Sequence, residues 1–233
     1  MIATATHGEE TIRYEVRFLA SRRTLAIEVH PDSRVLVRAP LDCPPAVVAV
    51  GGQKGARWIN PQLAQFERYR PRTPARQYVN GESHLYLGRQ YRLKLVPGDA
   101  ASVKLMRGRL LVSLPGTSDP GRVKALLHRW YLDRARIVFG KVVHASLSHF
   151  KDIGQPPLVV RTMQSRWGSL SRAGTMTLNV NLVRAPRSCI EYVVIHELCH
   201  TRHRDHDARF FKLLGQVMPD WEQRKQRLEA ALL

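Results

Sequence analysis

The stretch VVIHELCHTRHRDHDARFF, residues 193–211, decides how the rest of this chain is interpreted. His196 and His200 lie four residues apart, so a helix would place both imidazoles on one face, one turn from each other. Glu197 completes the pattern H-E-x-x-H, in which the two histidines bind zinc and the glutamate lies beside the metal without binding it. The stretch therefore predicts a helix that carries a zinc site.

The glutamate decides what such a site can do. Zinc lowers the pKa of a bound water toward about 7, and Glu197 can then accept a proton from that water and later donate it to a leaving amine. The alternative is a pair of partly buried core histidines. We favour zinc, because the expected helix has an apolar opposite face and more histidines follow it. The pattern therefore predicts a peptide-bond hydrolase.

A catalytic zinc site needs a third protein ligand and one open position. His203 follows on nearly the same helix face, but the axial rise carries it away from the first pair. His206 reaches the ion if the chain turns back after His203, and its distance from His196 matches the zincin pattern, although His203 replaces the glycine there. We therefore predict one zinc ion per chain, bound by His196, His200 and His206. Cys199 would point away from this pair, as a small core residue.

Two strands are predicted upstream of the metal-binding helix, at residues 158–163 and 175–180. Extended substrates pair with an edge strand by β-augmentation, and we expect residues 175–182 to provide that edge. Ser188 and Glu191 form the S-x-x-E pair of a capping box. This pair predicts that the metal-binding helix begins at about residue 189.

Three further residues are candidates for substrate binding. Asn179 either anchors the 175–182 strand or contacts substrate, and the anchoring role is preferred. Arg166 either stabilises a developing oxyanion or holds a partner carboxylate, with a surface or packing role as the alternative. His203 either supports the metal site and its substrate or is an exposed histidine at the end of the helix.

The first half of the chain is predicted to be rich in β-structure. Hairpins are expected around Gly88 and Gly108. A helical stretch that opens at Pro44 is expected to be interrupted at residues 51–52. The Pro/Arg segment 70–74 is a candidate linker, and no internal repeat is visible.

Helices are predicted to dominate the second half. A long amphipathic helix is expected at residues 118–150 with Asp119 as its N-cap, and Asp207 is expected to cap a later helix. We predict an α+β fold, in which residues 116–233 form a zincin-like metallopeptidase core with the H-E-x-x-H helix packed on a small mixed sheet. A β-rich region, residues 1–115, precedes this core, with one continuous domain as the alternative.

The composition indicates which partners the protein could bind and in which cellular compartment it is expected. The chain has 37 Lys+Arg against 19 Asp+Glu, a net charge of +18, and a field of this sign attracts polyanions such as nucleic acid. Solubility is the alternative explanation. Three cysteines do not form a disulfide framework, and neither a secretory signal nor a membrane-spanning apolar run is visible. We therefore expect a cytoplasmic protein without membrane contact, of unspecified oligomeric state.

Several motifs resemble the YgjP-like family of metallopeptidase domains, which is related to the SprT-like zinc peptidases. The chain carries four of them: RWGS at 166–169, LN-x-x-L before AP at 178–186, HELCH at 196–200 and DHD before FF at 205–211. RRTLAIEV and HLYLGRQYRL extend the resemblance over nearly the whole chain. Two positions depart from the family pattern, because Leu170 replaces a cysteine and Asp205 to Asp207 replace N-H-S.

The resemblance implies a zincin-like fold, a zinc cofactor, a peptide or protein substrate and His206 as the third ligand. SprT-like relatives include proteases that act on DNA-bound protein, so a DNA-stimulated protease is one alternative. A basic nucleic-acid-associated protein with a structural zinc is the other. Only an enzyme needs Glu197, so this residue separates the hypotheses.

Overall fold

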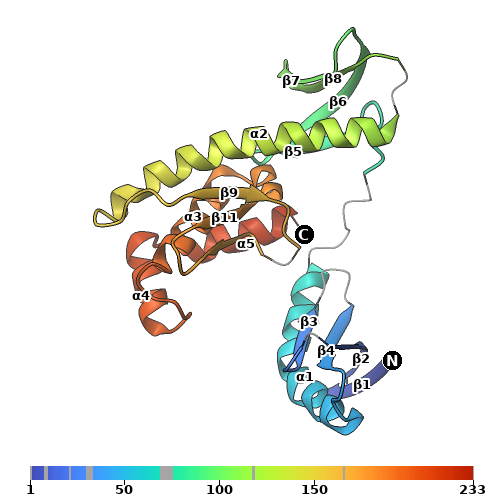
Figure 1. The fold of residues 1–233 in the computed structure, drawn as a ribbon, viewed down its shortest axis with the longest axis vertical. Coiled ribbons are helices and arrows are strands. Elements are labelled where there is room, and N and C mark those ends of the chain that lie inside the picture. Colours follow the sequence, from blue (N-terminus) through green and yellow to red (C-terminus); the bar gives the residue numbers. More distant parts are fainter. Residues whose placement is uncertain are drawn as a thin grey trace. The chain divides into compact units, whose positions relative to one another are not determined.

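The computed structural model describes residues 2–7, 10–20, 22–29, 34–68, 76–116, 119–164 and 166–232. The chain divides into two compact units, residues 1–73 and residues 74–232 (Figure 1). The predicted boundary between residues 115 and 116 falls inside the second unit and stays a prediction. The candidate linker at 70–74 lies outside the described residues. No helix in the described part of the chain combines the length and apolar character needed to cross a bilayer.

The first unit is a four-stranded sheet with one helix packed against it. Side chains alternate along β2, so Ile12, Tyr14 and Val16 face the core, where they meet Val48 and Ile59 of the helix. The elements are β1 (Ile2–His7), β2 (Glu10–Leu19), β3 (Ala26–Val29), β4 (Val35–Pro40) and α1 (Pro45–Arg68), with the strands in the order β1-β2-β4-β3.

Helix α1 is continuous, so the predicted interruption at residues 51–52 is wrong. The glycines there let the helix approach the sheet closely. A Cβ on Gly52 would lie 2.5 Å from the Oη of Tyr14, and a Cβ on Gly51 would lie 2.9 Å from Cδ1 of Leu25. Glycine costs a helix about 0.5–1 kcal/mol relative to alanine, which is less than the burial of one large side chain contributes.

The second unit opens with another four-stranded sheet and a long helix. Both predicted hairpins are confirmed, with turns at Gly88 and Gly108. The Asp119 carboxylate accepts a hydrogen bond from Arg122 N at 2.9 Å, which confirms the predicted N-cap. The elements are β5 (Ser83–Tyr86), β6 (Arg89–Pro97), β7 (Ser102–Met106), β8 (Arg109–Leu114), α2 (Pro120–Ser146) and the 3-10 helix η1 (Leu147–His149), with the strands in the order β5-β6-β8-β7.

The two four-stranded sheets share one topology. The structure therefore contains an internal repeat that is not visible in the sequence. In each sheet two antiparallel pairs join through one parallel pair, β2 with β4 and β6 with β8, and a helix follows. Corresponding residues of the last strand and the helix lie 75 positions apart, as in Pro40 and Pro115, Pro45 and Pro120, and Val48 and Val123.

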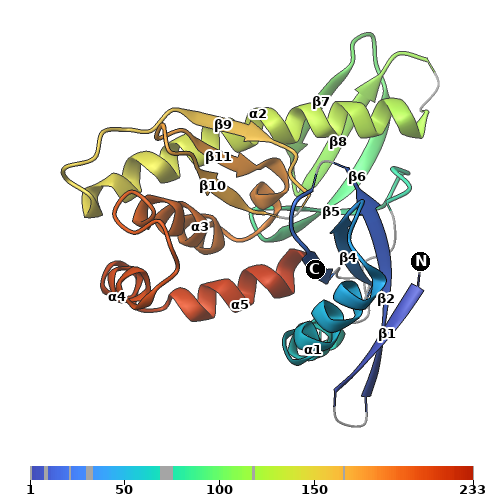
Figure 2. The same ribbon diagram turned by 60° about the horizontal axis from the view of Figure 1, so that its bottom comes forward.

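The rest of the second unit is an α+β core, and the predicted fold class is confirmed. Helix α3 packs against a three-stranded mixed sheet on one side and against α4 and α5 on the other (Figure 2). Buried side chains of α2, α3, α4 and the sheet form one hydrophobic core. The elements are β9 (Leu158–Arg161), β10 (Gly168–Leu170), β11 (Met176–Asn179), the 3-10 helix η2 (Val180–Arg184), α3 (Arg187–Cys199), α4 (Ala208–Val217) and α5 (Trp221–Leu232).

The prediction that residues 175–182 provide an edge strand is wrong. The sheet order is β10-β11-β9, so β11 is the central strand and both of its sides are hydrogen-bonded. The RWGSL stretch, which lies between the two predicted strands, supplies an edge strand of the sheet, β10. Three residues are too short for a period-2 pattern to be visible in the sequence.

The predicted capping box at the start of α3 is also wrong. The helix begins at Arg187, and its N-cap is Pro186, which offers no side-chain acceptor. Glu191 is instead held by Arg224 of α5, whose Nη1 donates to Glu191 Oε2 at 2.9 Å. Glu191 therefore binds Arg224, which is distant in sequence, and does not make the capping hydrogen bond at the start of its own helix.

The β5–β6 turn connects the second sheet to the segment before α3. Leu87 N donates to Val183 O and Gly88 N donates to Arg184 O, each at 2.9 Å. Gly88 has a φ of 77°, and a Cβ there would lie 2.8 Å from Cγ of Pro186. The hairpin thereby fixes the approach of the chain to α3.

Candidate metal centre

Three histidines converge at the C-terminal end of α3. His196 lies in the last turn of the helix, His200 directly follows the helix, and His206 lies in the loop that returns before α4. Each offers one ring nitrogen, and these three atoms all lie within 4.8 Å of one another. Nε2 of His196 and Nε2 of His206 are 2.9 Å apart. The three residues could therefore hold one metal ion.

The loop after α3 orients His200. Nδ1 of His200 lies 3.0 Å from the backbone oxygen of His203, and since a carbonyl only accepts, Nδ1 must carry the proton in this hydrogen bond. Nε2 then keeps a free lone pair for a ligand. His203 thus contributes its backbone to the site, and its own ring is not part of the histidine group.

Phe210 forms an apolar base under the three imidazoles. Its ring centroid lies 4.9 Å from that of His196 and 4.7 Å from those of His200 and His206, and the side chain is fully buried. Asp207 fixes its position, because the carboxylate accepts hydrogen bonds from Arg209 N and Phe210 N at 3.0 Å each. This confirms the predicted N-cap of α4. Phe210 was not predicted as a site residue, although its spacing of four from His206 was a usable signal.

The surroundings of His196 and His206 favour their neutral forms, which metal ligands must have. Burial, followed by the neighbouring His200 and His206, lowers the pKa of His196 to about 3. Burial and His200 also lower the pKa of His206. Nδ1 of His196 is buried and has no hydrogen-bond partner among the described residues.

Glu197 is held against the edge strand β10. It is 5% exposed, and burial raises its pKa to about 7, while the Leu170 N–H that it accepts and the nearby Arg166 act to lower it. Its Oε2 is buried without a partner among the described residues. A Cβ on Gly168 would lie 2.8 Å from Glu197 Oε1, so glycine is needed for this approach. Because Oε2 makes no hydrogen bond to a described residue, this oxygen can accept a proton.

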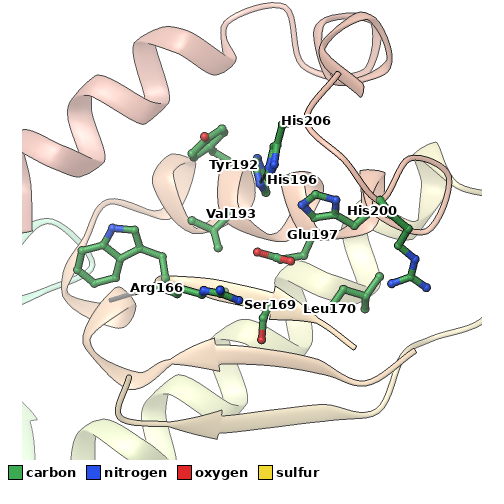
Figure 3. Close-up of a pocket in the computed structure, with 12 residues that line it drawn as sticks. Arg166, Ser169, Leu170, Tyr192, Val193, His196, Glu197, His200 and His206 are labelled. Atoms are coloured by element: carbon green, nitrogen blue, oxygen red, sulfur yellow. Dashed lines mark hydrogen bonds between the residues drawn. The ribbon is translucent and has the colours of Figure 1, made fainter. Parts of the chain in front are cut away.

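A cavity of about 550 Å³ opens in front of these residues (Figure 3). Its walls come from α3, from the returning loop and from β10 with the residues before it. The lining residues are Arg166, Trp167, Gly168, Ser169, Leu170, Tyr192, Val193, His196, Glu197, His200, Arg204 and His206.

The residues suggested for substrate binding fall in different places. Arg166 is exposed, lines the cavity and lies close enough to Glu197 to lower its pKa. Asn179 does not line this cavity, because its Nδ2 donates to the backbone oxygens of Met163 and Arg166 at 2.9 and 3.0 Å. It therefore anchors the segment that carries Arg166, and its suggested part in substrate binding stays a prediction. His203 does not line the cavity either.

The donor set fits a metal ion. A tetrahedral ion with bonds of about 2.0–2.1 Å separates its nitrogen ligands by about 3.3 Å. The 2.9 Å between His196 and His206 is within a few tenths of an ångström of that value. Three imidazoles beside an open cavity leave room for a fourth, exchangeable position.

Two solved structures are among the known proteins to which this chain is similar. The metallopeptidase zymogen jannalysin of Methanocaldococcus jannaschii is 18% identical, with 37% of this chain and 83% of that chain covered and a TM-score of 0.34. The zymogen abylysin of Pyrococcus abyssi is 20% identical, with 38% and 87% covered and a TM-score of 0.35. Curated proteins gave no match. Residues 23–231 match the YgjP-like metallopeptidase domain, so the chain belongs to the YgjP-like family of metallopeptidases.

Proposed function

We propose that this metallopeptidase depends on one zinc ion per chain, bound by His196, His200 and His206, with Glu197 as its general base. The observation that carries the proposal is the convergence of three histidine nitrogens beside a buried glutamate with a free oxygen. An all-nitrogen, three-ligand site with an open position is typical of catalytic zinc. The zinc would lower the pKa of a water in the cavity.

Glu197 would handle the proton in both halves of the reaction. Its free Oε2 accepts a proton from water, the water oxygen bonds to the carbonyl carbon, and the same proton passes to the amide nitrogen as the C–N bond breaks. Burial already raises the pKa of this carboxyl to about 7, which suits a group that must accept and then donate at neutral pH.

We propose that a peptide substrate lies along β10. This strand is one of the two edge strands of its sheet, and Gly168, Ser169 and Leu170 line the cavity beside Glu197. Backbone hydrogen bonds to an edge strand hold an extended chain without demanding a particular sequence. Arg166 and Arg204 also line the cavity and would meet the carbonyl oxygens or acidic side chains of that substrate.

Metal analysis tests the ligand set. Purified wild type should carry about one zinc per chain. His206→Ala should lose most of it, whereas His203→Ala should keep it, because His203 acts through a backbone oxygen. Undiminished zinc in His206→Ala would remove this histidine from the site.

A cleavage assay tests the base. Glu197→Gln should keep the zinc but lower the cleavage rate of a quenched-peptide library and of unfolded casein by at least about 100-fold. A nucleic-acid-associated protein with a structural zinc would keep its function in Glu197→Gln. Full hydrolysis by that variant would exclude the general-base role.

A further inference from the structure

The outer face of the β5–β8 sheet is strongly basic. The inner face carries Leu93, Leu110 and Val112, which pack against Val123 and Leu127 of α2. The alternate positions point away from that core, and four of them are exposed cations: Arg92, Lys94, Lys104 and Arg109.

The strand register brings these cations together. Arg92 lies opposite Arg109, so two like charges face each other across neighbouring strands. Lys94 and Lys104 lie on either side of Leu111. Like charges at directly opposed positions destabilise a sheet unless something neutralises them.

Nothing in the described part of the chain neutralises these cations. The strands β5 to β8 contain no aspartate or glutamate. None of the four cations forms an ion pair or side-chain hydrogen bond with a described residue. The face therefore presents four uncompensated positive charges to solvent.

The first sheet, which has the same topology, provides an internal comparison. There Leu36 takes the place of Leu111, and its two neighbours are Glu15 and Glu28. Glu28 pairs with Arg38 at 3.0 Å and Glu15 with Arg17 at 2.8 Å, so two cations of that face are paired with carboxylates. The shared topology therefore does not require a basic face, and the lysines of the second sheet call for a separate explanation.

We propose that this basic face, made by Arg92, Lys94, Lys104 and Arg109, binds the phosphate backbone of a nucleic-acid duplex. Neighbouring strands are about 4.8 Å apart and alternate residues on a strand about 6.7 Å apart. Four cations so close together can contact several phosphates of a duplex, which carries one charge per about 1.7 Å of helix axis.

The neutral residues of the face favour a duplex over a single strand. On β6, β7 and β8 they are Gln90, Val96, Ser102, Met106, Leu111 and Ser113, and on β5 they are Ser83 and Leu85, none of which is aromatic. Single-stranded nucleic acid is usually bound by stacking its bases on aromatic rings, and this face has none to offer. Contacts to phosphates alone imply binding that is independent of base sequence and sensitive to salt.

Fluorescence anisotropy with a labelled 20-base-pair DNA duplex tests the proposal. The affinity of the wild type should fall with salt, and Lys94→Gln/Lys104→Gln should lower the log–log slope by about 1.8 and weaken binding roughly tenfold. Lys94→Glu/Lys104→Glu, which copies the carboxylates of the first sheet, should abolish binding at 150 mM salt.

A matched control separates this face from overall charge. Lys141→Gln/Lys151→Gln also removes two positive charges, but near the C-terminal end of α2 and away from the basic face. This variant should bind the duplex like wild type. Circular dichroism checks that every variant is folded. Equal weakening in both double variants would overturn the proposal, as would tighter binding to a single strand or to anionic lipid vesicles than to the duplex.

Discussion

At the scale of single residues, the contact between Gly168 and Glu197 is the most demanding in the site. A Cβ at position 168 would lie 2.8 and 2.9 Å from atoms of Glu197 and 3.0 Å from Cγ1 of Val193. The glutamate fills the space that a side chain would need. The contact with strand β10 therefore determines the position of the Glu197 carboxylate.

Gly168→Ala should displace Glu197 and lower the cleavage rate by about 100-fold, since a shift of about 1 Å at a catalytic group has effects of this size. Zinc content should not change, because position 168 does not touch the histidine group. Gly140→Ala is the control, because a Cβ there meets nothing within 4 Å, and it should keep full activity. A wild-type cleavage rate in Gly168→Ala would show that the position of Glu197 does not depend on its contact with residue 168.

Much of the site at this scale was predictable, because helical spacing alone places His196, His200 and Glu197 together. The remaining contacts are long-range. The Leu170 N–H that reaches Glu197 and the Arg166 guanidinium near it come from a segment about 30 residues upstream. A single sequence has no periodic signal for such contacts.

At the scale of elements, the start of α4 controls the third histidine. Asp207 ends the returning loop with two hydrogen bonds of 3.0 Å, directly after His206. Asp119 makes the same kind of cap at the start of α2, far along the chain from the histidines. The two caps form a natural pair for comparison.

Asp207→Ala and Asp119→Ala should each lower the free energy of unfolding by about 0.5–2 kcal/mol. Only Asp207→Ala should also weaken metal binding, because it frees His206 and Phe210. Thermal melts and zinc competition with a chelating dye measure the two effects. Equal metal affinity in both variants would show that the cap and the site are independent.

Prediction of the elements succeeded where the signals were local. The hairpins, the N-caps of α2 and α4 and the H-E-x-x-H helix all follow from turn residues, capping residues and spacing. It failed where packing prevailed over local preference. Gly51 and Gly52 do not interrupt α1, because they bring it close to Leu25 and Tyr14, and Glu191 binds Arg224 in place of a cap.

At the scale of the whole molecule, the second sheet belongs with the metal-binding core. Tyr86 is a member of that core, the Tyr131 hydroxyl donates to Leu85 O at 2.7 Å, and the turn at Gly88 bonds to the segment before α3. A boundary at 115 and 116 would cut through these contacts.

A fragment of residues 74–233 should fold and bind about one zinc per chain, whereas residues 116–233 should not fold alone. The shorter fragment would lose the apolar cover that β5 to β8 give to α2. Circular dichroism and metal analysis of both fragments decide the matter. A folded, zinc-loaded 116–233 fragment would establish the boundary that the sequence suggested.

Phe210 has a consequence for how metal supply affects this protein. Its ring touches all three histidines and is also part of the main hydrophobic core. An ion held there, and not by the unfolded chain, adds about 2.7 kcal/mol of stability when its free concentration is one hundred times its dissociation constant. Chelation of the ion would therefore stop the cleavage of substrates by this protein. It would also make the protein unfold more often and so be degraded faster by cellular proteases.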